Sequence, residues 1–500
     1  MIPVRDFPGF ALLMLGGAGL MLVPAIMGAA TNDWPVARVF LDHAVFFAIA
    51  AVILGLAMMN RVPAIAARYH LVTILLAYAL LPAMLAAPFR ELAPGISFGA
   101  AYFEMLSSLT TTGATLFDRH PQLLSPPLHL WRALIGWVGG LMILVIAFAI
   151  LAPLNLGGFE FAQTGASHRD GRRSATIEEA GRRISRFSGV IAPIYTLCTG
   201  ILTLVLIFAG DSAFVALCHA MGTLSTSGIS PVGGLQNGQS GRFGEIAIAV
   251  MLLPAVSHRF LNYDRRARRR GLVDPQARLM LICVFGVTLV LFSRAWLGAV
   301  EIERQGEVAR SLHALWGGFF TSLSFLTTTG YESADWRTMQ LWSNLPTPGV
   351  ILMGLAVIGG GAATTAGGVK LLRVYALYRH GLREMDLLTH PSAMIRLGRG
   401  ERLISRDGAR IAFLFLMLFL IAIALAMLGL SATGLDFESS LMLAIAALTN
   451  TGPLAHSLGE GMSYSSLADT ALAILCAAMI VGRMEILVIV ALFNPAFWRR

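Results

Sequence analysis

Thr327-Thr328-Thr329-Gly330 is one of four short runs of small polar side chains that end in glycine, and these runs decide the fold. The other three are Thr110-Thr111-Thr112-Gly113, Ser225-Thr226-Ser227-Gly228 and Thr449-Asn450-Thr451-Gly452. We call the four runs the hydroxyl–glycine turns. Because they recur at nearly even intervals along the 500 residues, they indicate an internal repeat.

Apolar segments surround each turn in the same order. Hydrophobic residues make up 56% of the chain and charged residues 13%, whereas soluble proteins have roughly 25% charged residues. Long apolar runs approach or reach the roughly 20 residues that cross a bilayer as a helix. They are 10–29, 43–59, 70–88, 133–154, 189–209, 279–297, 411–430 and 470–493. A shorter apolar stretch of helical character precedes each turn, at 98–109, 212–224, 311–326 and 437–448.

The order of long span, short helix, turn and long span therefore occurs four times, after two further spans near the N-terminus. This order predicts an all-α polytopic membrane protein with about ten spans. Four units of first helix, pore loop and second helix would surround a pseudo-fourfold pore, with two extra N-terminal helices beside them. The predicted units, the N-terminal pair and four pore repeats, are 1–62, 63–156, 157–258, 259–385 and 386–500. Turns that simply connect helices would not recur in register with the apolar pattern.

Basic residues gather between the turns. The net charge is +9, and arginines cluster in 155–186, 258–277 and 371–409 and at Arg499 and Arg500. Cytoplasmic loops of membrane proteins carry such an excess of Lys and Arg. The basic loops and both termini are therefore predicted to be cytoplasmic, and the turns to lie toward the outer face. In so apolar a chain the charge indicates orientation in a lipid bilayer rather than binding to nucleic acid.

Four such turns around one axis would form a cation pore. Backbone at membrane depth must be hydrogen-bonded or line a water-filled cavity, and carbonyl oxygens that point inward can replace the hydration shell of a cation. Glycine allows the backbone angles that aim successive carbonyls the same way. The partial negative charge at the C-terminal end of each short helix favours a cation there.

No acidic residue lies within the turns, which favours K⁺ over Ca²⁺ as the bound ion. Thr and Ser hydroxyls could add oxygen ligands or hold the turn. The predicted K⁺ ligands are Thr111, Thr112, Thr226, Ser227, Thr328, Thr329, Asn450 and Thr451, beside the glycines Gly113, Gly228, Gly330 and Gly452. Acidic residues that follow the turns, Asp118, Glu332 and Asp335, would concentrate cations at the mouth, or are ordinary solvated loop charges.

A glycine-rich segment interrupts the apolar stretch 348–378, in the second span of the third unit. A regular helix does not tolerate so many glycines, at about 1 kcal/mol each, so a broken helix below the turns is a candidate gate. Its candidate residues are Gly359, Gly360, Gly361, Thr364, Thr365, Gly367, Gly368 and Lys370. The alternatives are a structural kink and a phosphate-binding loop, whose Gly-x-x-x-x-Gly-Lys-Ser/Thr pattern is absent. Arg483, inside the last span, is expected to bind carbonyls of this segment, or else to snorkel to the membrane edge.

The residues quoted above resemble the Trk/Ktr/HKT superfamily of potassium transporters, most of all its bacterial Trk branch. The resemblance covers essentially the whole chain, including the two N-terminal spans and the run Gly482-Arg483-Met484-Glu485. The four glycines match the K⁺-selective members. The segment Ala362-Ala363-Thr364-Thr365-Ala366 departs from the family, whose gate loop is usually richer in glycine.

The resemblance implies potassium uptake across the bacterial inner (plasma) membrane, with loop 359–370 as an intramembrane gate that Arg483 helps to hold shut. It also implies a homodimer with one pore per protomer, bound to a cytosolic ring of nucleotide-binding (RCK-type) regulatory subunits. K⁺ would be the transported ion, by a channel-like or a coupled mechanism, with no covalent cofactor.

Three other functions fit the sequence less well. A Na⁺ or mixed Na⁺/K⁺ carrier is disfavoured by the all-glycine turns. An intramembrane enzyme would need a paired acid–base or metal constellation, and the sequence shows no such pattern, so the chain is predicted not to be an enzyme. A non-conducting membrane scaffold or receptor would not need four equivalent turns.

Overall fold

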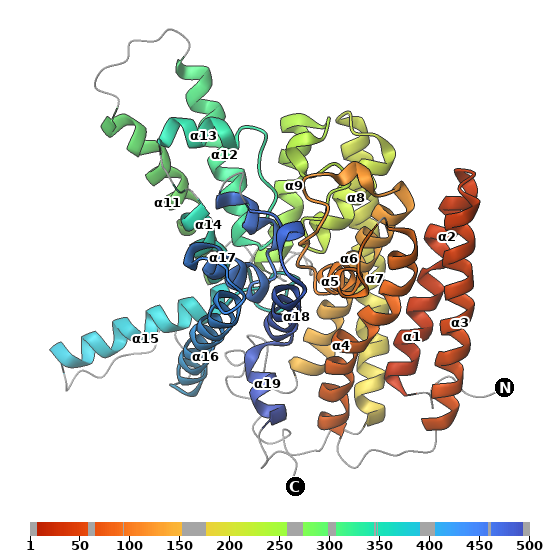
Figure 1. Ribbon diagram of the computed structural model, residues 1–500. Coiled ribbons are helices and arrows are strands. Elements are labelled where there is room, and N and C mark those ends of the chain that lie inside the picture. The colour runs from red at the N-terminus through yellow and green to blue at the C-terminus, as the bar shows by residue number, and fades with distance from the viewer. Residues whose placement is uncertain are drawn as a thin grey trace.

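The computed structural model describes residues 8–58, 66–93, 95–152, 177–257, 274–298, 307–344, 347, 349–390, 406–458 and 462–493. In these residues every regular element is a helix (Figure 1). Seven helical stretches are long and apolar enough to cross a membrane. They are Gly9–Ala30, Trp34–Met58, Tyr69–Leu92, Pro126–Leu151, Gly181–Phe208, Pro275–Arg294 and Gly408–Ser431. The predicted all-α, multi-pass membrane fold is confirmed.

The N-terminal helices stand at one side of the molecule. Helices α1 (Gly9–Leu20) and α2 (Leu22–Ala30) follow each other closely and both pack on α3 (Trp34–Met58). They also contact α4 (Ala66–Leu92) and α6 (Pro126–Ile146) of the first repeat. In Figure 1 they form the red edge of the bundle. The two N-terminal spans, Gly9–Ala30 and Trp34–Met58, therefore lie beside the four repeats, as the sequence predicts.

Each repeat contains a helix that ends at a hydroxyl–glycine turn, 12 residues long in three repeats and 20 residues long in the third. These helices are α5 (Phe98–Leu109), α8 (Ala213–Leu224), α12 (Glu307–Leu326) and α17 (Phe437–Leu448). Three of them begin at a capping side chain, Ser97, Ser212 or Asp436, that accepts a hydrogen bond from the first turn of the helix. Such a cap satisfies a backbone N–H that would otherwise lack a partner. We call the four helices the pore helices.

A long helix precedes each pore helix, and the helices that follow the pore helices differ in length, two of them being interrupted. The preceding helices are α4, α7 (Ile177–Phe208), α11 (Pro275–Gly298) and α16 (Arg406–Ser431). The following helices are α6 with its continuation η3 (Ala147–Leu151), α9 (Gly241–Val256), α14 (Gly349–Ile358) with α15 (Leu371–Thr389), and α18 (Asp469–Met484) with α19 (Ile486–Phe493). Short helices η2 (Pro121–Leu123), η5 (Leu235–Asn237), α13 (Trp336–Ser343), η9 (Gly452–Leu458) and η10 (Tyr464–Ser466) lie in the loops after the turns.

The structure interrupts one predicted span. The run 470–493, expected as a single helix, forms α18 and α19, because Glu485 between them has a left-handed φ of 63°. Three predicted domain boundaries, near 62, 156 and 258, lie outside the described residues. The fourth, between 385 and 386, falls inside α15, which continues to Thr389. The division into repeats otherwise stays a prediction.

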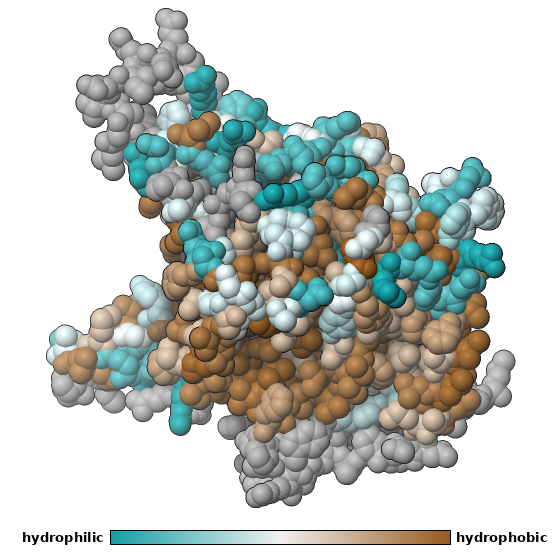
Figure 2. Space-filling model, in the orientation of Figure 1, coloured by the Kyte–Doolittle hydropathy of each residue, from teal (hydrophilic) through white to brown (hydrophobic). Residues whose placement is uncertain are grey.

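Polar and apolar surfaces separate along the molecule. Figure 2 shows apolar side chains in a broad brown band, and polar side chains gathered at the end where α8, α9, α12 and α13 lie. Inside, one apolar cluster includes residues of all four repeats, and another joins the N-terminal helices to the first repeat. Helix α15 projects sideways from the body in Figure 1. Most of the predicted basic loops lie outside the described residues.

Candidate functional site

The four hydroxyl–glycine turns share one unusual backbone angle. The second residue of each turn has a left-handed φ although it is not glycine: Thr111 (55°), Thr226 (53°), Thr328 (57°) and Asn450 (54°). A β-branched residue in this region costs about 1–2 kcal/mol. In each turn the N–H of the third residue donates back to its own pore helix, at 2.8 or 2.9 Å. The four turns are therefore wound in the same way.

The hydroxyls at the first and third positions hold this shape. Thr110 Oγ1 donates to Leu106 O of the pore helix (2.8 Å) and lies 2.8 Å from Thr112 Oγ1. The same pair of hydroxyls meets in the other turns: Ser225 with Ser227 (2.9 Å), Thr327 with Thr329 (3.1 Å) and Thr449 with Thr451 (3.1 Å). These hydrogen bonds hold the shape of each turn, and the role of the hydroxyls as oxygen ligands stays a prediction.

The turns close into a ring. Each turn glycine lies so near the next turn that a Cβ would collide with it, and most of these contacts are with backbone atoms. The contacts run from Gly113 to Ser227 O, from Gly228 to Thr329 O, from Gly330 to Pro453 and from Gly452 to the backbone of Ala114. Two hydrogen bonds join the fourth turn to the first, from Gly452 N to Thr112 O (2.7 Å) and from Asn450 Nδ2 to Thr112 Oγ1 (3.0 Å). The four repeats thus meet in cyclic order at one place.

A buried carboxylate holds the segment after the first turn. Glu104, in pore helix α5, accepts hydrogen bonds from Leu116 N (2.6 Å) and Thr115 Oγ1 (2.9 Å). Its second oxygen pairs with Arg132 of α6 at 2.8 Å. Both side chains of the pair are almost completely buried. A buried ion pair of this kind fixes geometry more than it adds stability.

The equivalent pore-helix position has a related role in two other repeats. In the second repeat it is His219, whose ring Nε2 lies 2.9 Å from Ser230 Oγ. In the third it is Thr321, whose hydroxyl accepts from Ser333 N at 3.2 Å. In the fourth it is the apolar Leu443. Polar side chains therefore fix the segment that follows the turn in three repeats.

A cavity of about 940 Å³ adjoins the ring on the side where the chain leaves the turns. We call it the outer cavity; Gly113, Gly228, Gly330 and Pro453 are part of its lining. The acidic, basic and histidine residues on its wall are Asp118, Arg119, Arg132, Glu332, Arg337 and His456. Burial raises the pKa of Glu332 to about 7. Of the three acidic residues predicted at the mouth, Asp335 does not line the cavity, because it pairs with Arg242 (2.7 Å) and His313 (3.2 Å).

The glycine-rich loop 359–370 is folded against the turns. It separates α14 from α15 and is almost entirely buried. Gly367 N donates to Thr328 Oγ1 of the third turn (2.8 Å), and a Cβ at Gly367 would collide with Thr449 O of the fourth. Gly361 N donates to Ala255 O of α9 (2.9 Å), and Ala362 N to Gln276 Oε1 of α11 (2.8 Å). The predicted break in the helix is confirmed.

Within the loop, Gly359, Gly368, Ala363 and Lys370 have left-handed φ values. Lys370 Nζ donates to Ala366 O, and Thr364 Oγ1 to Gly361 O at 2.8 Å. The loop is therefore a wound segment with its own hydrogen bonds, and only part of the left-handed backbone falls on glycine.

Arg483 binds the loop from α18. Its Nη1 donates to Thr365 O at 2.7 Å, and the side chain is buried. The expectation that Arg483 contacts a carbonyl of the glycine-rich segment is confirmed. Glu485, two residues later, pairs instead with Arg373 of α15 at 2.7 Å. The break between α18 and α19 thus carries two polar links to the loop and to the helix that follows it.

Sequence reasoning missed two parts of this site. The left-handed backbone at the second residue of each turn has no signal in the sequence, because the residues there are Thr and Asn rather than glycine. Glu104 and Arg132 were missed as well. A signal for them exists, since a charged residue within an apolar stretch is costly unless it is paired or hydrogen-bonded.

This arrangement defines a class of protein, a multi-pass, all-helical membrane protein whose four pore-loop repeats meet around one axis. The chain belongs to the TrkH family of cation transport proteins, whose family model matches residues 65–233 and 248–500. The Trk system potassium uptake protein TrkH of Halomonas elongata is 31% identical over 411 residues, 80% of this chain and 79% of the relative. TrkH of Escherichia coli K12 is 29% identical over 415 residues, 81% of this chain and 80% of the relative.

The fold agrees with a solved structure over its whole length. The crystal structure of the potassium transporter TrkH from Vibrio parahaemolyticus superposes with a TM-score of 0.82 and 25% sequence identity, and the match covers 100% of both chains. The family resemblance that the turns indicated is confirmed.

Proposed function

We propose that this protein takes up K⁺ across the inner membrane of a bacterium, through a pore whose selectivity filter is the ring of four hydroxyl–glycine turns. The observation that carries the proposal is the ring itself. Four turns with the same backbone shape close in cyclic order beside an outer cavity. The relatives named as potassium uptake proteins support K⁺ as the cargo.

The filter acts through backbone carbonyls. A dehydrated cation needs several oxygen ligands, and four converging turns supply them without a formal charge. Because the hydroxyls at the first and third positions bond within each turn, K⁺ is coordinated mainly by main-chain oxygens of the turn residues. Among the residues of the four turns, Thr111 Oγ1 and Asn450 Oδ1 are the side-chain oxygens that are buried without a hydrogen-bond partner. These two oxygens are the side-chain atoms most available to the ion.

Loop 359–370 is the gate. It lies directly against the third and fourth turns, so an ion that leaves the filter meets it next. Arg483 holds the loop in place through Thr365 O. The positive charge of Arg483 in this buried region also opposes the passage of a cation.

The proposal extends to the surroundings of the pore, where the family resemblance supports it. The protein acts as a homodimer and binds a cytosolic ring of nucleotide-binding regulatory subunits through its basic loops. Both termini and these loops face the cytoplasm. Its relatives are transporters, so we assign it no catalytic activity; K⁺ is its cargo, with no covalent cofactor.

Flux into liposomes tests the proposal. The purified protein with its regulatory partner should take up ⁸⁶Rb⁺ or K⁺ faster than protein-free vesicles, and excess K⁺ should compete better than excess Na⁺. Equal competition would identify a mixed carrier. No uptake above the protein-free control, in a preparation that is folded by circular dichroism, would contradict a transport function.

A further inference from the structure

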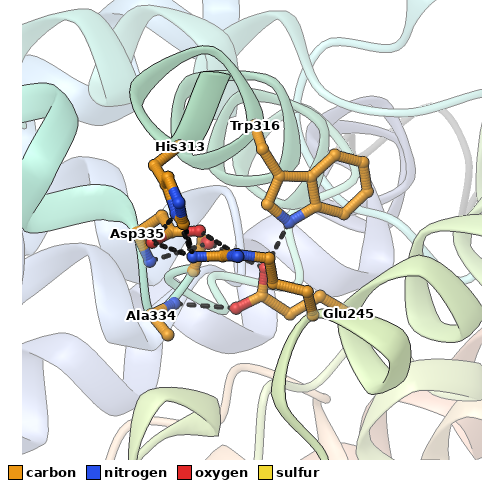
Figure 3. A network of polar contacts seen from close by, with 7 residues as sticks. Glu245, His313, Trp316, Ala334 and Asp335 are labelled. Atoms are coloured by element: carbon orange, nitrogen blue, oxygen red, sulfur yellow. Dashed lines mark hydrogen bonds and ion pairs between the residues drawn. The ribbon is translucent and has the colours of Figure 1, made fainter. Parts of the chain in front are cut away.

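Glu245 of α9, in the second repeat, extends into the third. Figure 3 shows its carboxylate between Trp316 and Ala334. Oε2 accepts from Trp316 Nε1 (2.6 Å) and from Ser333 Oγ (2.8 Å), and Oε1 accepts from Ala334 N (2.7 Å). Glu245 is 2% exposed. A carboxylate from one repeat is thus buried against the next.

The donors belong to both sides of the third turn. Trp316 lies on pore helix α12, before the turn, whereas Ser333 and Ala334 belong to the segment that leaves it. A single carboxylate therefore fixes the distance between the pore helix and the segment that follows the turn. The turn residues Thr327 to Gly330 lie between these two fixed points.

Other contacts support this segment on either side of the carboxylate. Thr321 accepts from Ser333 N (3.2 Å), and Tyr331 OH donates to Ile229 O, just after the second turn (3.0 Å). Arg242, three residues earlier on α9, has a half-exposed side chain and pairs with Asp335 (2.7 Å). The second repeat therefore contacts the segment after the third turn at three places, through Glu245, Ile229 and Arg242.

Burial of a carboxylate is costly unless its oxygens are hydrogen-bonded. At Glu245 three neutral donors meet this need, and hydrogen bonds to a charged acceptor are short and roughly twice as strong as neutral ones. Both oxygens are used, so an amide cannot replace the carboxylate: its single oxygen could not accept from both Ala334 and Trp316. The site therefore requires both acceptor oxygens of a carboxylate.

We propose that Glu245 is a positioning residue that sets the orientation of the third turn, and through it the preference for K⁺ over Na⁺. The inference rests on the proposed function of the turns as a filter. Loss of the carboxylate frees the outgoing segment from the pore helix, and the carbonyls of the third turn are then no longer held at a fixed spacing. Selectivity falls while the pore remains.

Glu245→Gln tests the proposal. The readout is the K⁺ to Na⁺ permeability ratio, taken from reversal potentials of the full-length protein in bilayers. We expect the ratio to fall roughly threefold to tenfold, the larger figure corresponding to about 1.4 kcal/mol. Glu438→Gln is the matched control, since it makes the same change on the exposed side of another pore helix, and it should leave the ratio unchanged. A purely structural role would lower yield and total flux at a constant ratio.

Trp316→Phe provides an independent test that keeps the carboxylate and removes one donor. It should lower the ratio less than Glu245→Gln, and it should have a smaller further effect in the Glu245→Gln background, because the contact is already broken. A conducting wild type together with unchanged ratios in Glu245→Gln and Trp316→Phe would overturn the inference. If Glu245→Gln does not fold, an unchanged ratio in Trp316→Phe alone would do so. A wild type that carries no K⁺ would instead contradict the proposed function.

Discussion

Gly113 offers the sharpest test of the filter. Its φ is 75°, in the left-handed region, and a Cβ placed on it would collide with the carbonyl oxygen of Ser227 in the neighbouring turn. The nearest obstacle is backbone rather than a flexible side chain. Serine at position 113 must therefore move either its own turn or the carbonyl of the next.

The size of the effect follows from two terms. A side chain in the left-handed region costs about 1–2 kcal/mol, and this cost falls on stability. Displacement of the Ser227 carbonyl instead lowers the preference for K⁺ over Na⁺, because filter oxygens distinguish the two ions by their number and arrangement. If its displacement removes about 1.4 kcal/mol of that preference, the K⁺ to Na⁺ permeability ratio of Gly113→Ser falls roughly tenfold.

Gly95 provides the control, because the two terms can be separated there. Its φ is 70°, close to that of Gly113, but nothing lies within 4 Å of a Cβ at this position. Gly95→Ser therefore has the same backbone strain without the collision. Reversal potentials with K⁺ on one side of a bilayer and Na⁺ on the other should show a normal ratio for Gly95→Ser and a reduced one for Gly113→Ser. An unchanged ratio in a folded Gly113→Ser protein would refute the role of the first turn.

Two further predictions concern the gate and the outer cavity. Arg483→Ala removes the hydrogen bond to Thr365 O and should raise K⁺ flux several-fold in the absence of the regulatory partner. Arg410→Ala, at an exposed arginine of α16, is the control and should leave the flux unchanged. Lower flux in Arg483→Ala would contradict the proposed role of Arg483. Burial raises the pKa of Glu332 to about 7, so its carboxylate is mostly charged only above that pH. The charged carboxylate attracts cations to the outer cavity. Flux at low K⁺ should therefore increase as the pH rises through 7. Glu332→Gln should flatten this dependence in a flux assay at fixed membrane potential, and a retained pH step would assign it to another group.

The sequence predicted the parts of the fold that depend on local pattern. Pore helices α5 and α17 have the predicted bounds, and α8 begins one residue later than expected, because a short apolar stretch that ends at a hydroxyl–glycine turn has few alternatives. The first helix of each repeat was clear from its length. The break at Glu485 was not predicted, because the run 470–493 is long enough to span as one helix despite Arg483 and Glu485, and the break depends on one backbone angle.

Long-range contacts account for most of what the sequence left undetermined in the site. Asn450 and Thr112 are 338 residues apart in the chain, yet they are hydrogen-bonded across the ring. No local pattern pairs them, and none pairs Glu245 with Ser333. The repeat established that four equivalent turns exist, but their cyclic order and the side chains that join them follow from packing of the whole bundle.

The same packing implies that the proposed filter and the proposed gate are coupled. Gly367 N donates to Thr328 Oγ1, and its backbone lies against Thr449 O, so loop 359–370 cannot move away without changing the surroundings of the third and fourth turns. Thr328 is also the left-handed residue of its turn, and its hydroxyl is the acceptor that the loop would release. Movement of the loop would therefore free a strained residue inside the filter. For this reason opening the gate should alter ion preference as well as ion flow.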